Sequence, residues 1–588
     1  MTADTTCFDA RVKALKSPEF LASLREIKRG VEREALRINP NGTLAQTPHP
    51  KPLGSALSHE SITTDFSESL LEFITPPEAS SAKTVAQLKD IHRFVADNIN
   101  DEQIWPLSMP CFIDDETEIP IAYFGESNVG KMKRVYRIGL KNRYGSMMQA
   151  IAGVHFNFSF PDSFWALWAK QNGTTHSQEQ TSADYFGLIR NYRRLCWLIP
   201  YLYGASPALC SSFLKGKEYS LPFKKVGKGT LYMPYATSLR MSDLGYTSAE
   251  QSSLKICYNE LDNYVRLLRD AMSTPSTRFE RFASGEGGNY QQLSHNIIQI
   301  ENELYSPIRP KQPTESMEKP TDALVRRGIS YIEVRALDVN PFSSVGISDT
   351  QFNFLDVFLL ACLLIPSEEF DEQQLNEAKE NMDRVVLEGR KPELMLSNNG
   401  VDVTLPEWSK KLFTYFEQAA NILDEANDTK QYSEAVAQEY AKTQNPELTP
   451  SAKILQTLLS ENKDNSIFGL ELAAKYNKEM KTFDYTYTQS EDFVEQGERS
   501  YEAQREIEAA DTKDFDTFIK DYFAEPPAKK NALHRSGIKR FQGNTHFTRT
   551  LIKTRYEPKV QKMGCFFINS HRSFSTIDRG VCHNASEK

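Results

Sequence analysis

The 588-residue sequence has no Cys-x-x-Cys pair and no long hydrophobic run. Its eight cysteines are scattered along the chain, so they predict neither a zinc ribbon nor a disulfide framework, and a reducing cytoplasm is the expected location. The longest apolar run, residues 357–365, is far shorter than the roughly 20 residues that span a bilayer. The first 16 residues lack the apolar segment of a signal peptide. We therefore expect neither a membrane protein nor a secreted, disulfide-rich one.

The net charge of −9 conceals two regions of opposite sign. Residues 525–588 hold 13 Lys and Arg against 4 Asp and Glu, a net charge of +9, which leaves −18 on the first 524 residues. An acidic body of this kind argues against nucleic acid as the partner of the main part of the chain. The basic tail is interpreted as a disordered appendage or as translation past the natural end, and a docking arm for an acidic partner or membrane surface is the alternative.

Two carboxylates lie close together in residues 29–38 (RGVEREALRI). Side chains alternate along an extended strand, so Glu32 and Glu34 would point to the same face. At about 4 Å and an effective dielectric constant of about 20, two such charges repel by about 4 kcal/mol. The pair therefore favours a cation between them, although an exposed strand with separated, solvated side chains would also fit the pattern.

A second acidic stretch, residues 62–77 (ITTDFSESLLEFITPP), places Asp65, Glu68 and Glu72 among apolar neighbours. Glu68 and Glu72 share a face whether the stretch forms a strand, with a period of two, or a helix, in which i and i+4 are neighbours. We therefore expect these two carboxylates on one surface in either case.

Two further stretches alternate between apolar and polar residues. Residues 153–160 (GVHFNFSF) carry His155 on the polar face, and residues 330–340 (SYIEVRALDVN) carry Glu333 and Arg335 there. A single histidine on a strand is usually structural, but four half-buried strands that each offer a carboxylate or imidazole predict a shared divalent-cation site. Oxygen ligands with at most one imidazole favour Mg²⁺ or Mn²⁺ over zinc.

Residues 125–131 (GESNVGK) match the core of a phosphate-binding P-loop. Met132 stands where such a loop needs a Ser or Thr hydroxyl, and Glu126 would face the phosphate, so we favour a mobile substrate or phosphate loop over a P-loop. A solvated basic helix is the other interpretation. The candidate residues are Lys131, Lys133, Arg134, Tyr136 and Arg137.

Arg240 lies in a loop-rich stretch, residues 234–246, among small polar residues. A guanidinium in this setting suits bidentate binding of a carboxylate, and a purely structural role is equally compatible with the sequence.

The character of the chain changes after residue 348. Ser348 and Gln351 form a capping box, and the sequence to about residue 524 is helical and charged. We predict a catalytic α+β core in residues 1–347, a helical region in residues 348–524 that braces the same catalytic unit, and the basic, disordered tail in residues 525–588.

From about residue 20 to about residue 523 the chain resembles the proteobacterial type of glutamate–cysteine ligase. The similarity is carried by long motifs, namely RGVEREALRI, LGSALSHESITTDFSESLLEFITP, WPLSMPC, KNRYGSMMQAIAGVHFNFS, IPYLYGASPALCSSFL, MPYATSLRMSDLGY, QIENELYSPIRP and YIEVRALDVNPF.

The resemblance implies a glutamine synthetase-like α+β fold with a curved antiparallel sheet as its active-site face. It also implies the reaction: ATP phosphorylates the γ-carboxylate of L-glutamate, the amine of L-cysteine attacks the acyl phosphate, and γ-glutamylcysteine is released in the first step of glutathione synthesis. Mg²⁺, with Mn²⁺ possible, is the implied cofactor, and glutathione the implied feedback inhibitor. The expected protein is a cytoplasmic monomer with no nucleic-acid or membrane partner.

The resemblance also implies roles for individual residues. The metal shell would consist of Glu32, Glu34, Asp65, Glu72, His155 and Glu333. Arg335 would contact the transferred phosphoryl group, and with Glu333 and Glu72 it would form the catalytic set. The amino-acid pocket would consist of Tyr136, Gln149, Arg240, Tyr246 and Tyr305.

Three rival functions remain open at this stage. A related ligase could use another amine in place of cysteine, a catalytically silent protein could keep the sheet for metal or amino-acid sensing, and a P-loop NTPase could use Lys131.

Overall fold

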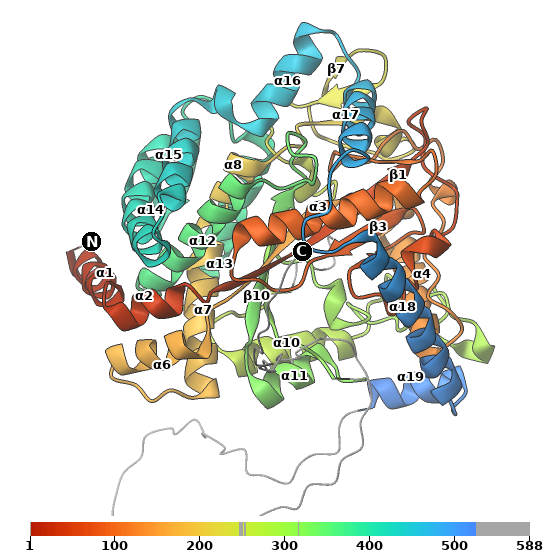
Figure 1. Cartoon of the computed structure of the whole chain (residues 1–588), viewed down its shortest axis with the longest axis horizontal. Helices are drawn as coiled ribbons and strands as arrows, with labels where there is room; N and C mark the ends of the chain where they lie inside the picture. The colour runs from red at the N-terminus through yellow and green to blue at the C-terminus, as the bar shows by residue number, and fades with distance from the viewer. Residues whose placement is uncertain (1, 246–250, 252–253, 316, 525–588) are drawn as a thin grey trace, which may run out of the picture.

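The strands that carry the predicted site residues lie in one antiparallel sheet. The computed structural model describes residues 2–245, 251, 254–315 and 317–524 (Figure 1). The strands of the sheet, in spatial order, are β2 (Ile62–Thr64), β3 (Leu70–Ile74), β1 (Lys28–Ile38), β5 (Gly153–Ser159), β10 (Tyr331–Asp338) and β9 (Ile308–Lys311), and β4 (Gln103–Ile104) pairs with the end of β1.

Alternation along the strands separates an apolar face of the sheet from a polar one. Val31, Phe156 and Val334 stand in register across β1, β5 and β10, and all three are fully buried. Phe156 packs edge-on against Phe352 of α12 (Asp349–Leu364), with ring centroids 5.4 Å apart. On the neighbouring strand β3, Phe73 contacts His92 of α3 (Ser81–Asn98) in the same way. Helices α3 and α12 thus cover the apolar face, and His92 is a core residue.

A bulge interrupts the alternation expected in β10. Val334 pairs with Phe156 and Leu337 pairs with Val154, so two residues of β10 stand opposite one residue of β5. Such a bulge adds twist and changes the direction of the side chains at its site. Here it lies at Arg335, next to the polar face.

Helices surround the sheet and its connections. In the first part of the chain they are α1 (Thr2–Leu15), α2 (Pro18–Leu24), α4 (Asn128–Tyr144), α5 (Ser146–Gln149), α6 (Asp162–Gln171), α7 (Gln178–Leu195), α8 (Leu198–Tyr203), α10 (Leu261–Ser273) and α11 (Pro320–Arg327). A small sheet of β6 (Ala208–Cys210), β8 (Thr230–Tyr232) and β7 (Lys224–Val226) completes this part.

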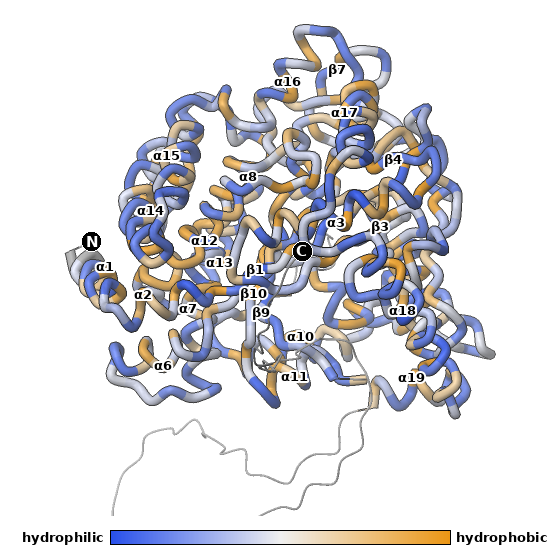
Figure 2. The backbone as a smooth tube through the Cα atoms, in the orientation of Figure 1, coloured by the Kyte–Doolittle hydropathy of each residue, from blue (hydrophilic) through white to orange (hydrophobic). Residues whose placement is uncertain are grey.

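The second part of the chain is helical, as the sequence predicts. Its helices are α12, α13 (Glu372–Glu388), α14 (Leu405–Asn427), α15 (Gln431–Gln444), α16 (Pro450–Ser460), α17 (Asn465–Met480), α18 (Ser490–Ala510) and α19 (Phe515–Phe523). The capping box of Ser348 and Gln351 begins α12, and every residue from Gln351 to Leu364 is buried. Helix α15 is more hydrophilic along its length than α12 (Figure 2). A hairpin of β11 (Met395–Asn398) and β12 (Val401–Thr404), which the sequence reading missed, joins α13 to α14.

In the described part of the chain, we find no helix that combines the length and apolar character of a membrane span. The basic tail predicted for residues 525–588 lies outside the described residues.

A buried ion pair ties β1 to α12. The side chain of Arg29 is 2% exposed and that of Asp356 is 0% exposed, and the Nη2 to Oδ2 distance is 2.7 Å. Arg29 also donates hydrogen bonds to the carbonyl oxygens of Ile27 and Ala79. Removal of one partner from such a pair leaves an uncompensated charge in the interior.

We expect Asp356→Ala to lower the free energy of unfolding by about 3–5 kcal/mol, because the guanidinium of Arg29 would stay buried without its carboxylate. Urea denaturation would measure the change. Asp270→Ala is the matched control, since Asp270 pairs with Arg266 on the surface, where both side chains are more than half exposed. Equal effects of the two substitutions would contradict the prediction.

Candidate active site

The centre of the polar face is formed by β1 and its two neighbours. Glu32 stands opposite His155 of β5, and Glu34 stands opposite Glu72 of β3. The strand reading of residues 29–38 is therefore confirmed, and antiparallel pairing brings the predicted residues of three separate stretches together.

His155 lies at the centre of this cluster. Its Nδ1 lies 3.1 Å from Glu32 Oε2 and 3.6 Å from Glu333 Oε1, and its Nε2 lies 3.6 Å from Glu34 Oε1. Backbone and amide groups hold two of the carboxylates in place: Asn157 Nδ2 donates to Glu32 Oε1 at 2.8 Å, and the N–H of Gly153 donates to Glu34 Oε2. One imidazole thus contacts three carboxylates from two other strands.

Two cations stabilise the charge of Glu333. Its side chain is 1% exposed, with Arg335 Nη1 at 3.0 Å from Oε1 and Lys311 Nζ at 3.6 Å from Oε2. Burial disfavours the carboxylate form, but the charges of Lys311 and Arg335 outweigh it and hold the pKa of Glu333 well below its ordinary value. Glu333 is therefore ionised.

The opposite end of the cluster lacks this compensation. Burial and the negative charge of Glu32 raise the pKa of Glu72 well above its ordinary value, and burial together with Glu34 raises the pKa of Asp65. Arg137 of α4 lies 3.8 Å from Asp65, between Nη2 and Oδ1. The excess negative charge at this end is what a bound cation would relieve.

The donor atoms fit a divalent cation. One ligand atom each from Glu32, Glu72 and His155 lie within 4.8 Å of one another. Among the described residues, His155 Nε2 and Glu333 Oε2 are buried and have no hydrogen-bond partner. An imidazole nitrogen and a carboxylate oxygen are both good metal ligands.

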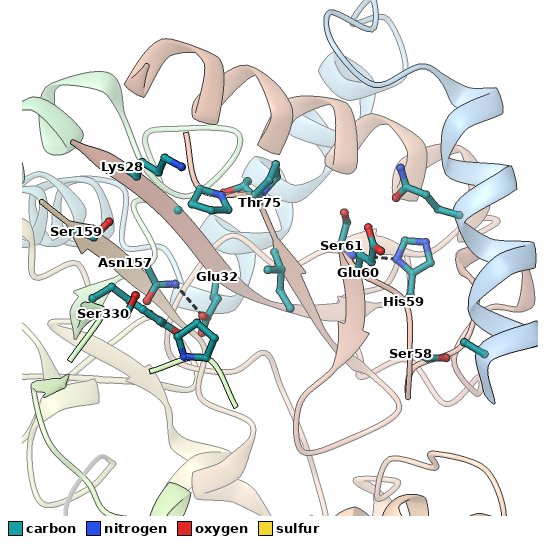
Figure 3. Close-up of a pocket in the computed structure, with 18 of the residues that line it drawn as sticks. Lys28, Glu32, Ser58, His59, Glu60, Ser61, Thr75, Asn157, Ser159 and Ser330 are labelled. Atoms are coloured by element: carbon teal, nitrogen blue, oxygen red, sulfur yellow. Dashed lines mark hydrogen bonds between the residues drawn. The ribbon is translucent and has the colours of Figure 1, made fainter. Parts of the chain in front are cut away.

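A cavity of 1360 Å³ opens beside the cluster. Glu32 and Asn157 lie at its floor, Lys28, Ser159 and Ser330 lie along one arm, and His59, Glu60 and Ser61 lie along the other (Figure 3). Residues of α18 and Lys133 of α4 also line the cavity. The cavity is large enough to hold more than one small ligand.

Four of the five residues predicted for the amino-acid pocket lie in the described structure. Gln149 Nε2 donates to the hydroxyl of Tyr305 at 3.3 Å, and burial together with the negative charge of Glu303 raises the pKa of the half-buried Tyr136 phenol well above its ordinary value. Arg240 is fully buried and donates from Nη2 to the carbonyl oxygen of Arg335. Tyr246 lies outside the described residues.

Glu68 does not share the surface of Glu72, contrary to the expectation. The stretch forms two strands with a turn between them, and Glu68 lies in that turn. Its carboxylate accepts the N–H groups of His49 and Tyr123 and lines a separate pocket of 490 Å³. Neither a strand nor a helix continues from residue 68 to residue 72, so neither periodicity applies.

The P-loop interpretation of residues 125–131 is not supported. The N–H of Glu126 donates to the carboxylate of Glu508, and the N–H of Asn128 donates to that of Asp511. Backbone donors that would bind phosphate in a P-loop are thus occupied by carboxylates. Lys131 is exposed and lies 3.6 Å from Glu126.

Sequence reasoning missed two residues of the cluster. Strand alternation puts Asn157 on the same face as His155, but the sequence alone indicates no role for it. Lys311 ends β9, which has four residues and contains Pro310, so its alternation is too short to recognise in the sequence.

Comparisons with known proteins show the family of the chain. A family model described as glutamate-cysteine ligase matches residues 12–385. The glutamate–cysteine ligase of Pseudoalteromonas translucida is 48% identical over 511 residues, which cover 87% of this chain and 97% of the relative. That of Serratia proteamaculans is 48% identical over 502 residues, 85% of this chain and 96% of the relative.

Solved structures agree as well. The crystal structure of glutamate–cysteine ligase from Francisella tularensis in complex with AMP has a TM-score of 0.79 and 36% identity, and covers 85% of this chain and 97% of its own. A bifunctional glutathione synthetase from Pasteurella multocida shares the fold, with a TM-score of 0.61, 22% identity, and coverage of 82% of this chain and 56% of its own. The family match and the relatives place the chain in one family: it belongs to the glutamate–cysteine ligases.

Proposed function

We propose that this protein joins the γ-carboxylate of L-glutamate to the amine of L-cysteine at the expense of ATP, through a γ-glutamyl phosphate, in the first step of glutathione synthesis. The observation that carries the proposal is the gathering of five carboxylates and one imidazole, flanked by Lys and Arg, at a large cavity in a chain of this family. We further propose a cytoplasmic monomer that glutathione inhibits, since the resemblance implies these properties.

The chemistry of such a ligase accounts for the distribution of charge. In the first step a γ-carboxylate oxygen attacks the terminal phosphorus of ATP, and ADP leaves. In the second step the amine nitrogen attacks the acyl carbon, loses a proton and expels phosphate. Both steps bring several negative charges together, so positioned cations supply most of the stabilisation of the transition state.

The cationic side chains of this chain would act on the phosphoryl group. Arg335 projects from the bulge of β10 beside Glu333, which keeps the guanidinium at the cluster. A guanidinium offers two parallel N–H donors to phosphate oxygens. Lys133 lines the cavity from the other side, near Glu72. The two side chains would hold the transferred group between the sheet and α4.

Glu32, Glu72 and His155 are the residues that would hold Mg²⁺, with Glu34, Asp65 and Glu333 beside them. A bound divalent ion supplies neutralisation of the phosphate oxygens. The predominance of carboxylate oxygens favours Mg²⁺, and the single imidazole is also compatible with Mn²⁺.

The amino-acid substrates would bind near Tyr136, Gln149 and Tyr305, and the resemblance assigns Arg240 and Tyr246 to the same pocket. The contact of Gln149 with Tyr305 supports this assignment, because it joins two of the predicted residues. A glutamine synthetase-like curvature of the sheet is part of the proposal, supported by the antiparallel strand order. We also propose that residues 1–347 and 348–524 form one catalytic unit. The position of α18 supports this, because the helix belongs to the second region and lines the cavity beside the carboxylates.

The direct test is ADP release by purified protein with ATP, Mg²⁺ and L-glutamate, with and without L-cysteine, and identification of the peptide by mass. Cysteine-dependent ADP with an equal amount of γ-glutamylcysteine would support the proposal. ADP with a different amine product, for example from 2-aminobutyrate alone, would indicate a related ligase, and folded protein without turnover would indicate a silent binding protein.

We expect Glu32→Gln and Glu333→Gln each to lower kcat by about 10²–10³-fold while the fold is retained, because charge is lost without loss of volume. Steady-state kinetics and circular dichroism would measure the two properties. Glu417→Gln, at an exposed carboxylate of α14, is the control. If Glu333→Gln retained activity, Glu333 would have no part in the mechanism.

We expect Glu72→Gln to weaken Mn²⁺ binding at least tenfold, because an amide offers no charge to the cation. Electron paramagnetic resonance of free Mn²⁺ would report the affinity in the absence of substrates. Unchanged affinity in this variant would remove Glu72 from the metal site.

A further inference from the structure

The beginning of α4 is held by carboxylates from the C-terminal helices. Asp511, just after α18, accepts the N–H of Asn128, the first residue of α4. Glu508 accepts the N–H of Glu126 at 2.9 Å, and Asn128 Nδ2 donates to the carbonyl oxygen of Lys513 at 2.9 Å. We call residues 508–519 the α18–α19 corner. The corner lies beyond residues 12–385, which the family model matches.

Apolar contacts reinforce the same junction. Phe518 and Ile519 of α19 form a buried cluster with Val135 of α4 and Leu293, separate from the main core. The hydroxyl of Tyr290 donates to Asp516 at 2.6 Å and extends the contact. The corner therefore contacts α4 at its first turn and at Val135, and its residues Asp511 and Phe518 line the same cavity as Lys133.

The other side of α4 faces the carboxylate cluster. Lys133 lines the cavity, and burial together with the positive charge of Arg137 lowers the pKa of its amine to about 8. Arg137 Nη2 lies 3.8 Å from Asp65 Oδ1, and Arg137 Nε donates to the backbone carbonyl oxygen of Asp65. The ring of Phe124 lies against both cationic groups. Its centroid is 5.2 Å from Lys133 Nζ and 4.4 Å from Arg137 Cζ.

We propose that Asp511 is a positioning residue for the ligase reaction: its bond to the first N–H of α4 sets the placement of Lys133 over the cavity. A negative charge at a helix N-terminus is favourable, and the bond fixes the helix where it begins. Lys133 follows five residues later on a continuous helix, so a displacement of Asn128 is carried to its amine. A misplacement of about 1 Å can cost about 100-fold in rate. The inference rests on the proposed function.

Asp511 suits a test of this role because its side chain is exposed, so that its truncation opens no cavity in the core. We would compare Asp511→Ala, which removes the acceptor, with Asp511→Asn, which keeps one carbonyl oxygen. Glu502→Ala is the matched control, an exposed carboxylate of the same helix. Thermal unfolding of each variant would show whether the fold is retained.

We expect Asp511→Ala to lower kcat about tenfold with a smaller change in the KM for L-glutamate, because Lys133 would act on the transferred phosphoryl group, whereas Tyr136 is the one residue proposed for the amino-acid pocket that lies on α4. Asp511→Asn should recover part of the loss, and Glu502→Ala should match the wild type. A kcat of Asp511→Ala equal to that of the control would overturn the proposal.

A double-mutant cycle with Lys133→Ala separates positioning from a general structural effect. If Asp511 acts through Lys133, Asp511→Ala should change kcat less than about twofold once Lys133 is absent. Equal losses in both backgrounds would overturn the proposal. Wild-type protein that forms no γ-glutamylcysteine would instead overturn the proposed function, and the positioning role with it, whereas an active wild type isolates the role of Asp511.

Discussion

The polar face of the sheet is organised by the need to offset the repulsion among the carboxylates that share it. Glu32, Glu34 and Glu72 converge within hydrogen-bonding or near-contact distance of one imidazole or of one another. Such a grouping would be unfavourable on its own. It is held by strand pairing, which sets the positions of the side chains, and by cations at its edges.

Positively charged side chains balance the carboxylates more completely at one end of the cluster than at the other. Lys311 and Arg335 keep Glu333 ionised at one end, while Glu72 at the other end has a raised pKa and lies nearer to Lys133 and Arg137 of a helix. The negative charge of Glu333 is balanced by nearby cations, whereas that of Glu72 is less well balanced. A cation with its phosphate ligands would therefore bind more favourably at the end of Glu72. In our proposal, the residues that hold α4 in place contribute to this arrangement, although they lie far away in the sequence.

Much of the sheet could be predicted because its strands are amphipathic. Residues 29–38, 153–160 and 330–340 alternate, so each strand and its polar face follow from period two. Prediction from alternation fails where the period of two is interrupted. The turn at Glu68 and the bulge at Arg335 are local departures that the pairing partner decides, and β9 is too short to show a pattern.

The sequence by itself determined which side chains each strand offers and the family to which the long motifs point. Only the tertiary structure decided which strands are neighbours, that Lys311 and Asn157 join the cluster, and that Glu508 and Asp511 occupy the N–H groups of residues 126 and 128. The physical reason is that alternation is a property of one strand, whereas register, charge compensation and helix capping across hundreds of residues arise from pairing between segments, which no local pattern records.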